Sequence, residues 1–103
     1  MENQHSEQKA IELCEKCADV CTTNAEKCRE EGLDDCARLC MECAIACNNV
    51  VDQEGKVDPD LLKKCADACG ACAAKCEAHD NQHCTECAKI CRECQEACYS
   101  AMD

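Results

Sequence analysis

Seventeen cysteines supply most of the reactive side chains in this 103-residue chain. Five neighbouring pairs are three residues apart and seven are four apart, and the two spacings alternate within four groups. This alternation is typical of one face of a packed α-helix, so it predicts four helices that each carry a stripe of thiols. The predicted metal ligands are Cys14, Cys17, Cys21, Cys28, Cys36, Cys40, Cys43, Cys47, Cys65, Cys69, Cys72, Cys76, Cys84, Cys87, Cys91, Cys94 and Cys98.

Thiolates are ligands for soft metals, above all Cu(I), Zn(II) and iron–sulfur clusters. Charge distinguishes these metals, because four Zn(II) ions with four thiolates each would bury a charge of about −8 in a narrow core. Burying uncompensated charge is very costly. A Cu⁺ that replaces each thiol proton instead leaves the core neutral. The sequence therefore favours many Cu(I) ions, about one per cysteine and on the order of 17 per chain.

Other uses of the thiols make different predictions. A zinc or mixed-metal buffer that resembles a metallothionein would bind about four Zn(II) per chain. A disulfide-stapled helical protein would have few free thiols and would need an oxidising compartment. A thiol oxidoreductase would contain one cysteine pair of unusually low pKa. The chain shows no nucleophile with a base and an orienting acid, so we do not expect an enzyme.

The elements that position these thiols follow from the same spacing. We expect one domain over residues 1–103 with helices at about 6–31, 34–53, 59–78 and 82–102. Ser6 is the expected N-cap of the first helix, Gly32 is its expected C-terminal stop, and Asp58-Pro59 begins the third. Gly70 lies inside the third helix, where it costs about 1 kcal/mol relative to alanine and would permit close packing. Short connections make neighbouring helices antiparallel, which predicts an all-α, up-down-up-down four-helix bundle with a cysteine-lined core.

Composition and charge limit the classes of function that the chain can have. Phe and Trp are absent and Tyr99 is the only aromatic residue, so sulfur must fill much of the interior. The net charge of −11 disfavours nucleic acid as a partner. No apolar run is long enough to cross a membrane. The first nine residues lack the basic and apolar segments of an export signal, so we expect a cytoplasmic protein, whose thiols stay reduced.

The two ends of such a bundle should differ. One end gathers His79, Asp80, His83 and Asn24, and we expect copper to enter there. His79 continues the stripe of the third helix and should point inward, while Asn24 occupies a position of the first stripe where a cysteine is expected. The opposite end should form an apolar plug, which we define as Val50, Val51, Leu61, Leu62, Tyr99 and Met102.

The whole pattern resembles the copper storage proteins, which are small four-helix bundles that bind many Cu(I) ions with inward-facing cysteines. The most specific match is Cys76-Glu-Ala-His79-Asp80-Asn-Gln-His83-Cys84 and the cysteine steps that follow it. The resemblance is to the cytosolic branch, and it implies a homotetramer that stores Cu(I). It also implies that His79, His83 and Asn24 form a polar mouth beside the outermost coppers. Such a store would exchange metal with a copper chaperone or a chelator.

Overall fold

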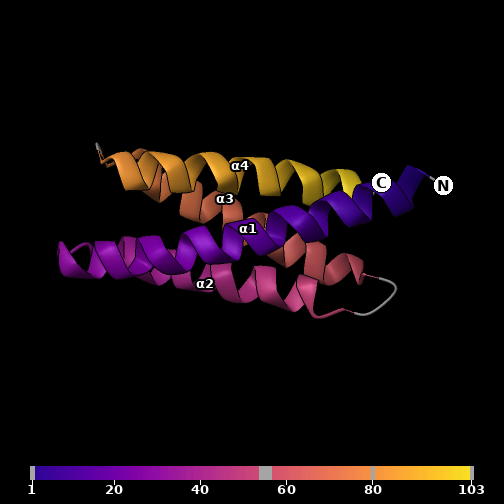
Figure 1. The fold of residues 1–103 in the computed structure, drawn as a ribbon, viewed down its shortest axis with the longest axis horizontal. Coiled ribbons are helices and arrows are strands. Elements are labelled where there is room, and N and C mark those ends of the chain that lie inside the picture. Colours follow the sequence, from indigo (N-terminus) through magenta and orange to yellow (C-terminus); the bar gives the residue numbers. More distant parts are fainter. Residues whose placement is uncertain (1, 54–56, 80, 103) are drawn as a thin grey trace.

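The computed structural model describes residues 2–53, 57–79 and 81–102 and shows a bundle of four helices in which neighbours are antiparallel (Figure 1). They are α1 (Glu2–Glu30), α2 (Asp34–Val51), α3 (Pro59–Glu77) and α4 (Gln82–Met102). Helix α1 packs against α2 and α4, and α3 packs against the same two helices. The molecule measures 44 × 19 × 17 Å, so its length is close to that of α1 alone. The four-helix bundle expected from the cysteine spacing is confirmed.

Local sequence explains where two of the helices stop or start. Gly32 has a left-handed φ of +78°, and the backbone N–H of Leu33 donates to the carbonyl of Cys28 at 2.8 Å, which closes the end of α1. The carboxylate of Asp58 accepts from the backbone N–H of Asp60 at 2.9 Å, and Pro59 occupies the first turn of α3. Both signals were predicted from the sequence.

The start of α1 differs from the prediction. The helix begins at Glu2 rather than near residue 6, so Ser6 lies inside it and is not its N-cap. Residues 2–9 contain neither Gly nor Pro, so nothing in the chain stops the helix from extending toward the N-terminus. At the other ends, α2 stops at Val51 and α3 stops at Glu77, one or two residues before the expected bounds.

The apolar plug is present in part. Val50 and Leu62 are buried, and so is Val57, which was not predicted to belong to the plug. Tyr99 was predicted to belong to the plug, but it is 45% exposed. Its neighbour Cys98 takes the inward position, and successive residues on a helix point about 100° apart, so Tyr99 faces outward.

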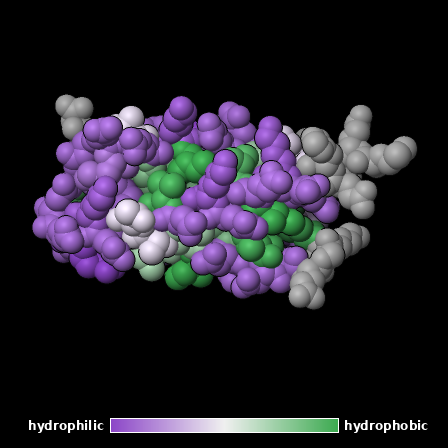
Figure 2. Space-filling model, viewed as in Figure 1, coloured by the Kyte–Doolittle hydropathy of each residue, from purple (hydrophilic) through white to green (hydrophobic). Residues whose placement is uncertain are grey.

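The outer faces of the helices are polar. Figure 2 shows one side of the bundle as mostly hydrophilic, with smaller hydrophobic areas between the charged side chains. Ile45 is the largest exposed aliphatic residue of the described chain, at 57% exposure. None of the described helices has the length and apolar composition needed to cross a membrane.

Candidate metal centre

All 17 cysteines point into the bundle and are free thiols, and none is more than 1% exposed. Their alternating spacing of three and four residues keeps them on one face of each helix, and the four faces meet at the bundle axis. Small alanines occupy many of the remaining buried positions, which lets the helices approach closely. The interior is therefore a column of sulfur atoms rather than an aliphatic core.

The sulfur atoms touch one another along this column. Each Sγ makes at least one contact of hydrogen-bonding geometry with another Sγ, at 3.4–4.0 Å. Most of these contacts join different helices. Metal ions bound between such sulfurs would cross-link the helices of the bundle.

Sets of four thiols lie close enough to share metal ions. In five of them all four Sγ atoms lie within 4.8 Å of one another. The sets overlap, because a cysteine such as Cys17 or Cys21 belongs to two of them. Overlap is what thiolates that bridge two metals require. The five sets are Cys14/Cys65/Cys94/Cys98, Cys17/Cys47/Cys69/Cys94, Cys17/Cys21/Cys43/Cys91, Cys21/Cys72/Cys87/Cys91 and Cys40/Cys72/Cys76/Cys87.

Burial keeps two thiols near one end of the column, those of Cys28 and Cys36, protonated when no metal is bound. It raises the pKa of Cys28 and of Cys36, because the protein interior solvates a thiolate poorly. Deeper in the core the direction depends on the hydrogen bonds: contact with Cys17 raises the pKa of Cys21 and lowers that of Cys91. A bound soft cation would replace these protons.

A polar cluster closes one end of the column, and we call it the mouth: Asn24, Glu31, His79, Asn81 and His83. Asn24 is only 2% exposed, and its Nδ2 donates to the sulfurs of Cys40 and Cys76 at 3.2 and 3.5 Å. Its Oδ1 meets His83 Nδ1 at 2.5 Å, which places the predicted Asn24 and His83 in direct contact.

Glu31 belongs to the mouth, although it was not among the residues predicted from the sequence. Its Oε1 accepts from His83 Nε2 at 3.0 Å and from Asn81 Nδ2 at 3.3 Å. These contacts join the turn after α1 to the start of α4 and the residue before it. Sequence spacing contains no signal for this pairing, because it depends on how the end of α1 meets the start of α4.

His79 lies at the same end, half-buried. Its Nε2 atom is fully buried and has no hydrogen-bond partner among the described residues. This matches the expectation that His79 points inward, and it leaves a buried ring nitrogen without a partner at this end of the bundle. Asp80, which was also predicted for this end, lies outside the described residues.

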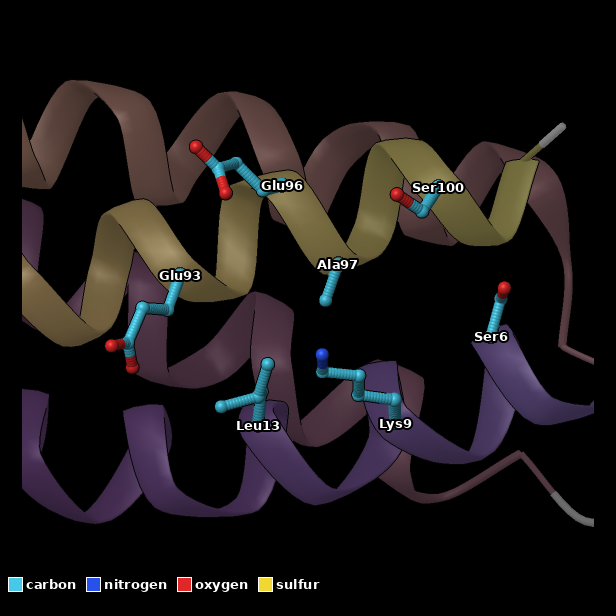
Figure 3. Close-up of a pocket in the computed structure, with 7 residues that line it drawn as sticks. All are labelled: Ser6, Lys9, Leu13, Glu93, Glu96, Ala97 and Ser100. Carbon is cyan, nitrogen blue, oxygen red and sulfur yellow. The ribbon is translucent and has the colours of Figure 1, made fainter.

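Two surface hollows lie between α1 and α4. The smaller, of about 240 Å³, reaches Asn24 and His83 from the side, and its other lining residues are Asp19, Val20, Thr23, Lys27 and Glu86. The larger, of about 560 Å³, lies toward the plug, where Lys9 and Leu13 of α1 face Ala97 of α4 (Figure 3). No cysteine or histidine lines the larger hollow. Only the smaller hollow therefore adjoins the mouth.

Known proteins of similar sequence and structure share this architecture. The chain is 40% identical over 97 residues to the uncharacterized cysteine-rich protein YhjQ of Bacillus subtilis (strain 168), covering 87% of this chain and 90% of the relative. It superposes with a TM-score of 0.86 and 31% identity on a cytosolic copper storage protein from Streptomyces lividans that was loaded with five coppers, covering 97% of this chain and 94% of the other.

A second solved structure and a family comparison show the same similarity to copper storage proteins. The Cu(I)-bound copper storage protein BsCsp3 superposes with a TM-score of 0.87 and 34% identity, over 95% of this chain and 99% of the other. The sequence model of the copper storage protein family matches residues 3–103, nearly the whole chain. The thiol-lined bundle and these matches together show that the chain belongs to the copper storage protein family.

Proposed function

We propose that this chain stores and buffers Cu(I) by binding it to the 17 thiols of the bundle interior. The observation that carries the proposal is that all 17 thiols are free, buried and in contact with one another. A fold alone would not need this, because alanine and leucine would fill the same space without the risk of oxidation. Storage is a binding role, and we propose no catalytic activity for the chain.

The expected capacity is about one Cu(I) per cysteine, on the order of 17 per chain. Each thiol then exchanges one proton for one Cu⁺, and each thiolate bridges two coppers. The overlapping sets of four sulfurs support this arrangement, because a shared sulfur cannot belong to two separate mononuclear sites without bridging them.

We propose that copper enters and leaves at the mouth, where His83 lies beside Cys84 and His79 follows Cys76, the last thiol of α3. The free Nε2 of His79 and the contact of 3.6 Å between His83 Nδ1 and Cys84 Sγ support this route. The buried Val50, Val57 and Leu62 at the other end speak against a route through the plug. Asn24 is the third proposed polar residue on the route.

The setting of the protein is also part of the proposal. The solved relative from Streptomyces lividans is described as cytosolic, and free thiols persist in that compartment, so we propose a cytoplasmic location. We further propose a homotetramer, as the family resemblance implies. A copper chaperone or a small chelator would then deliver and remove the metal at each mouth.

An anaerobic titration tests the storage function. The fully reduced protein is titrated with Cu(I) against a competing chelator, and bound metal and free thiols are quantified at each step. Saturation near one copper per thiol, on the order of 17 per chain, is the expected result. Saturation after only a few metal ions would overturn the proposal.

Zinc is the alternative that the geometry permits. Four sulfurs around a tetrahedral Zn(II) at about 2.3 Å lie about 3.8 Å apart, close to the sulfur contacts of the empty protein. A parallel titration with Zn(II) distinguishes the two metals. Binding of about four Zn(II) with little preference for Cu(I) would favour a metallothionein-like buffer. Few free thiols in the untreated protein would favour the disulfide-stapled alternative.

A further inference from the structure

We infer that Asn24 divides the thiol interior into two compartments, and that copper moving between them crosses at Asn24 and His83. The inference rests on the storage function proposed above and adds where the slow step of copper exchange lies. It follows from which sulfurs touch one another and from the side chain that stands between the two sets.

The sulfur contacts fall into two separate sets. Within the described chain, contacts of hydrogen-bonding geometry up to 4.0 Å join fifteen sulfurs into one inner network, which ends toward the mouth at Cys36, Cys40 and Cys76. Cys28 and Cys84 contact each other at 3.9 Å and form an outer pair of their own. A longer side-chain interaction between Cys28 and Cys36 affects the pKa of both thiols, but their sulfurs do not come within 4.0 Å of each other in hydrogen-bonding geometry.

Asn24 occupies the place where the path between the two sets is interrupted. On α1 it lies three residues after Cys21 of the inner network and four residues before Cys28 of the outer pair. A thiol at this position would extend the sulfur stripe of α1 without a gap. The amide instead donates to Cys40 and Cys76 of the inner network.

His83 connects this amide to the outer pair. Its Nδ1 lies 2.5 Å from Asn24 Oδ1 and 3.6 Å from Cys84 Sγ. The contacts thus run from Cys84 through His83 and Asn24 to Cys40. Glu31 acts as a positioning residue, because its carboxylate holds the far nitrogen of the same imidazole at 3.0 Å.

Copper crosses this point by ligand exchange without a change of oxidation state. One Cu–S bond breaks as a bond to the next thiol or imidazole donor forms, and the proton that this donor loses moves to the vacated sulfur. Between touching sulfurs one soft ligand replaces another. An amide is a poor ligand for soft Cu(I), so the step across Asn24 is slower than the steps within either compartment.

Release kinetics test the inference. Protein fully loaded with Cu(I) is mixed anaerobically with an excess of a chromogenic Cu(I) chelator. The wild-type chain should release copper in a small fast phase from the outer pair and a large slow phase from the inner network. Asn24→Cys should accelerate the slow phase at least about fivefold, which corresponds to about 1 kcal/mol of activation free energy.

Asn24→Ser is the matched control, because serine and cysteine differ only in oxygen and sulfur. It should keep two phases and the slow rate of the wild type. Equal slow rates in Asn24→Cys and Asn24→Ser would overturn the inference. Far-UV circular dichroism of both empty variants verifies that they fold, and if Asn24→Cys does not fold, the Glu31 variants below carry the test.

Glu31→Ala tests the positioning role. The Glu31→Ala variant should have a lower rate in the slow release phase and an unchanged copper capacity. The Glu31→Gln variant can still accept a hydrogen bond from His83, so it should retain the wild-type rate. Glu30→Ala removes the same charge one residue away and should have no effect. An unchanged or faster slow phase in Glu31→Ala would contradict the role of His83 as the connecting ligand.

The copper capacity distinguishes a failure of the proposed crossing point from a failure of the proposed storage function. A wild-type capacity near one copper per thiol, with release that none of these substitutions alters, would overturn only the crossing point. A capacity of a few metal ions would overturn the storage function and the crossing point together.

Discussion

The empty protein keeps a buried thiol where most small proteins have an aliphatic side chain. Burial raises the pKa of Cys28 and Cys36, so both remain protonated in the folded chain at pH values where an exposed thiol ionises. Because their pKa differs between the folded and the unfolded chain, their contribution to folding stability depends on pH. In the proposed copper store, the same protons would also be displaced by the metal.

We predict that the empty, reduced protein loses stability as the pH rises above about 8.5, the usual pKa of an unfolded thiol. Below that pH both states hold the thiol protons, so these groups add no pH dependence. Above it the unfolded chain releases protons that folded Cys28 and Cys36 still retain, so the free energy of unfolding falls with pH. Anaerobic urea denaturation at pH 7 and pH 9.5 measures this difference.

A double variant provides the control for this pH dependence. Cys28→Ser combined with Cys36→Ser removes two of the groups whose pKa is raised, so its loss of stability between the two pH values should be smaller than that of the wild type. A free energy of unfolding that is constant or rises over this range would contradict the prediction.

At the scale of helices, most of the fold can be predicted from the cysteine spacing. The alternation of three and four residues specifies which face of each helix is buried, and Gly32 and Asp58-Pro59 mark where α1 ends and α3 begins. The start of α1 could not be predicted in the same way, because residues 2–9 carry no cysteine and no breaker.

The mouth shows a second limit of prediction from sequence. Position 24 stands out because it breaks the stripe of α1, and His79 continues the stripe of α3. The contact between Glu31 and His83 has no such signature, because Glu31 lies in the turn after α1 and His83 lies in the first turn of α4, 52 residues away. The separation of Cys28 and Cys84 from the inner network also depends on the relative heights of helices, which spacing along one chain does not specify.

Gly70 gives a prediction at the same scale. A Cβ atom at this position of α3 would lie 2.5 Å from Nε2 of Gln95 on α4, so Gly70→Ala must displace that side chain. Alanine favours a helix over glycine by about 1 kcal/mol, and the displacement of this flexible side chain should offset part of the gain. In a Gln95→Ala background the obstacle is absent, and Gly70→Ala should then stabilise the protein by about 1 kcal/mol.

Thermal or chemical unfolding of the four proteins in this double-mutant cycle measures the coupling. If Gly70→Ala destabilises the chain in the Gln95→Ala background as well, the glycine is needed for the approach of the two helix backbones and not for the amide of Gln95.

For the whole molecule, filling the interior with Cu⁺ should leave the charge unchanged. The empty chain carries −11 at pH 7. Each Cu⁺ that replaces a proton keeps that value, whereas four Zn(II) ions bound to sixteen thiolates would add a charge of about −8. The copper-loaded and empty proteins should therefore elute from an anion-exchange column at the same salt concentration.

Zinc loading is the internal comparison for this measurement. If Zn(II) fills sites of four thiolates, the loaded protein should elute at higher salt than the empty one. A copper-loaded protein that elutes at clearly higher salt than the empty chain would contradict the one-for-one exchange of protons for Cu⁺.

The buried Val50, Val57 and Leu62 close the end of the bundle opposite the mouth. A compartment with a single opening works as a stack, in which the newest arrivals lie nearest the opening. In a chain that stores copper, ions near Cys14 and Cys98 would be a reserve that exchanges slowly, while those near Cys28 and Cys84 would exchange quickly. The depth of a stored ion would then reflect how long it has been bound.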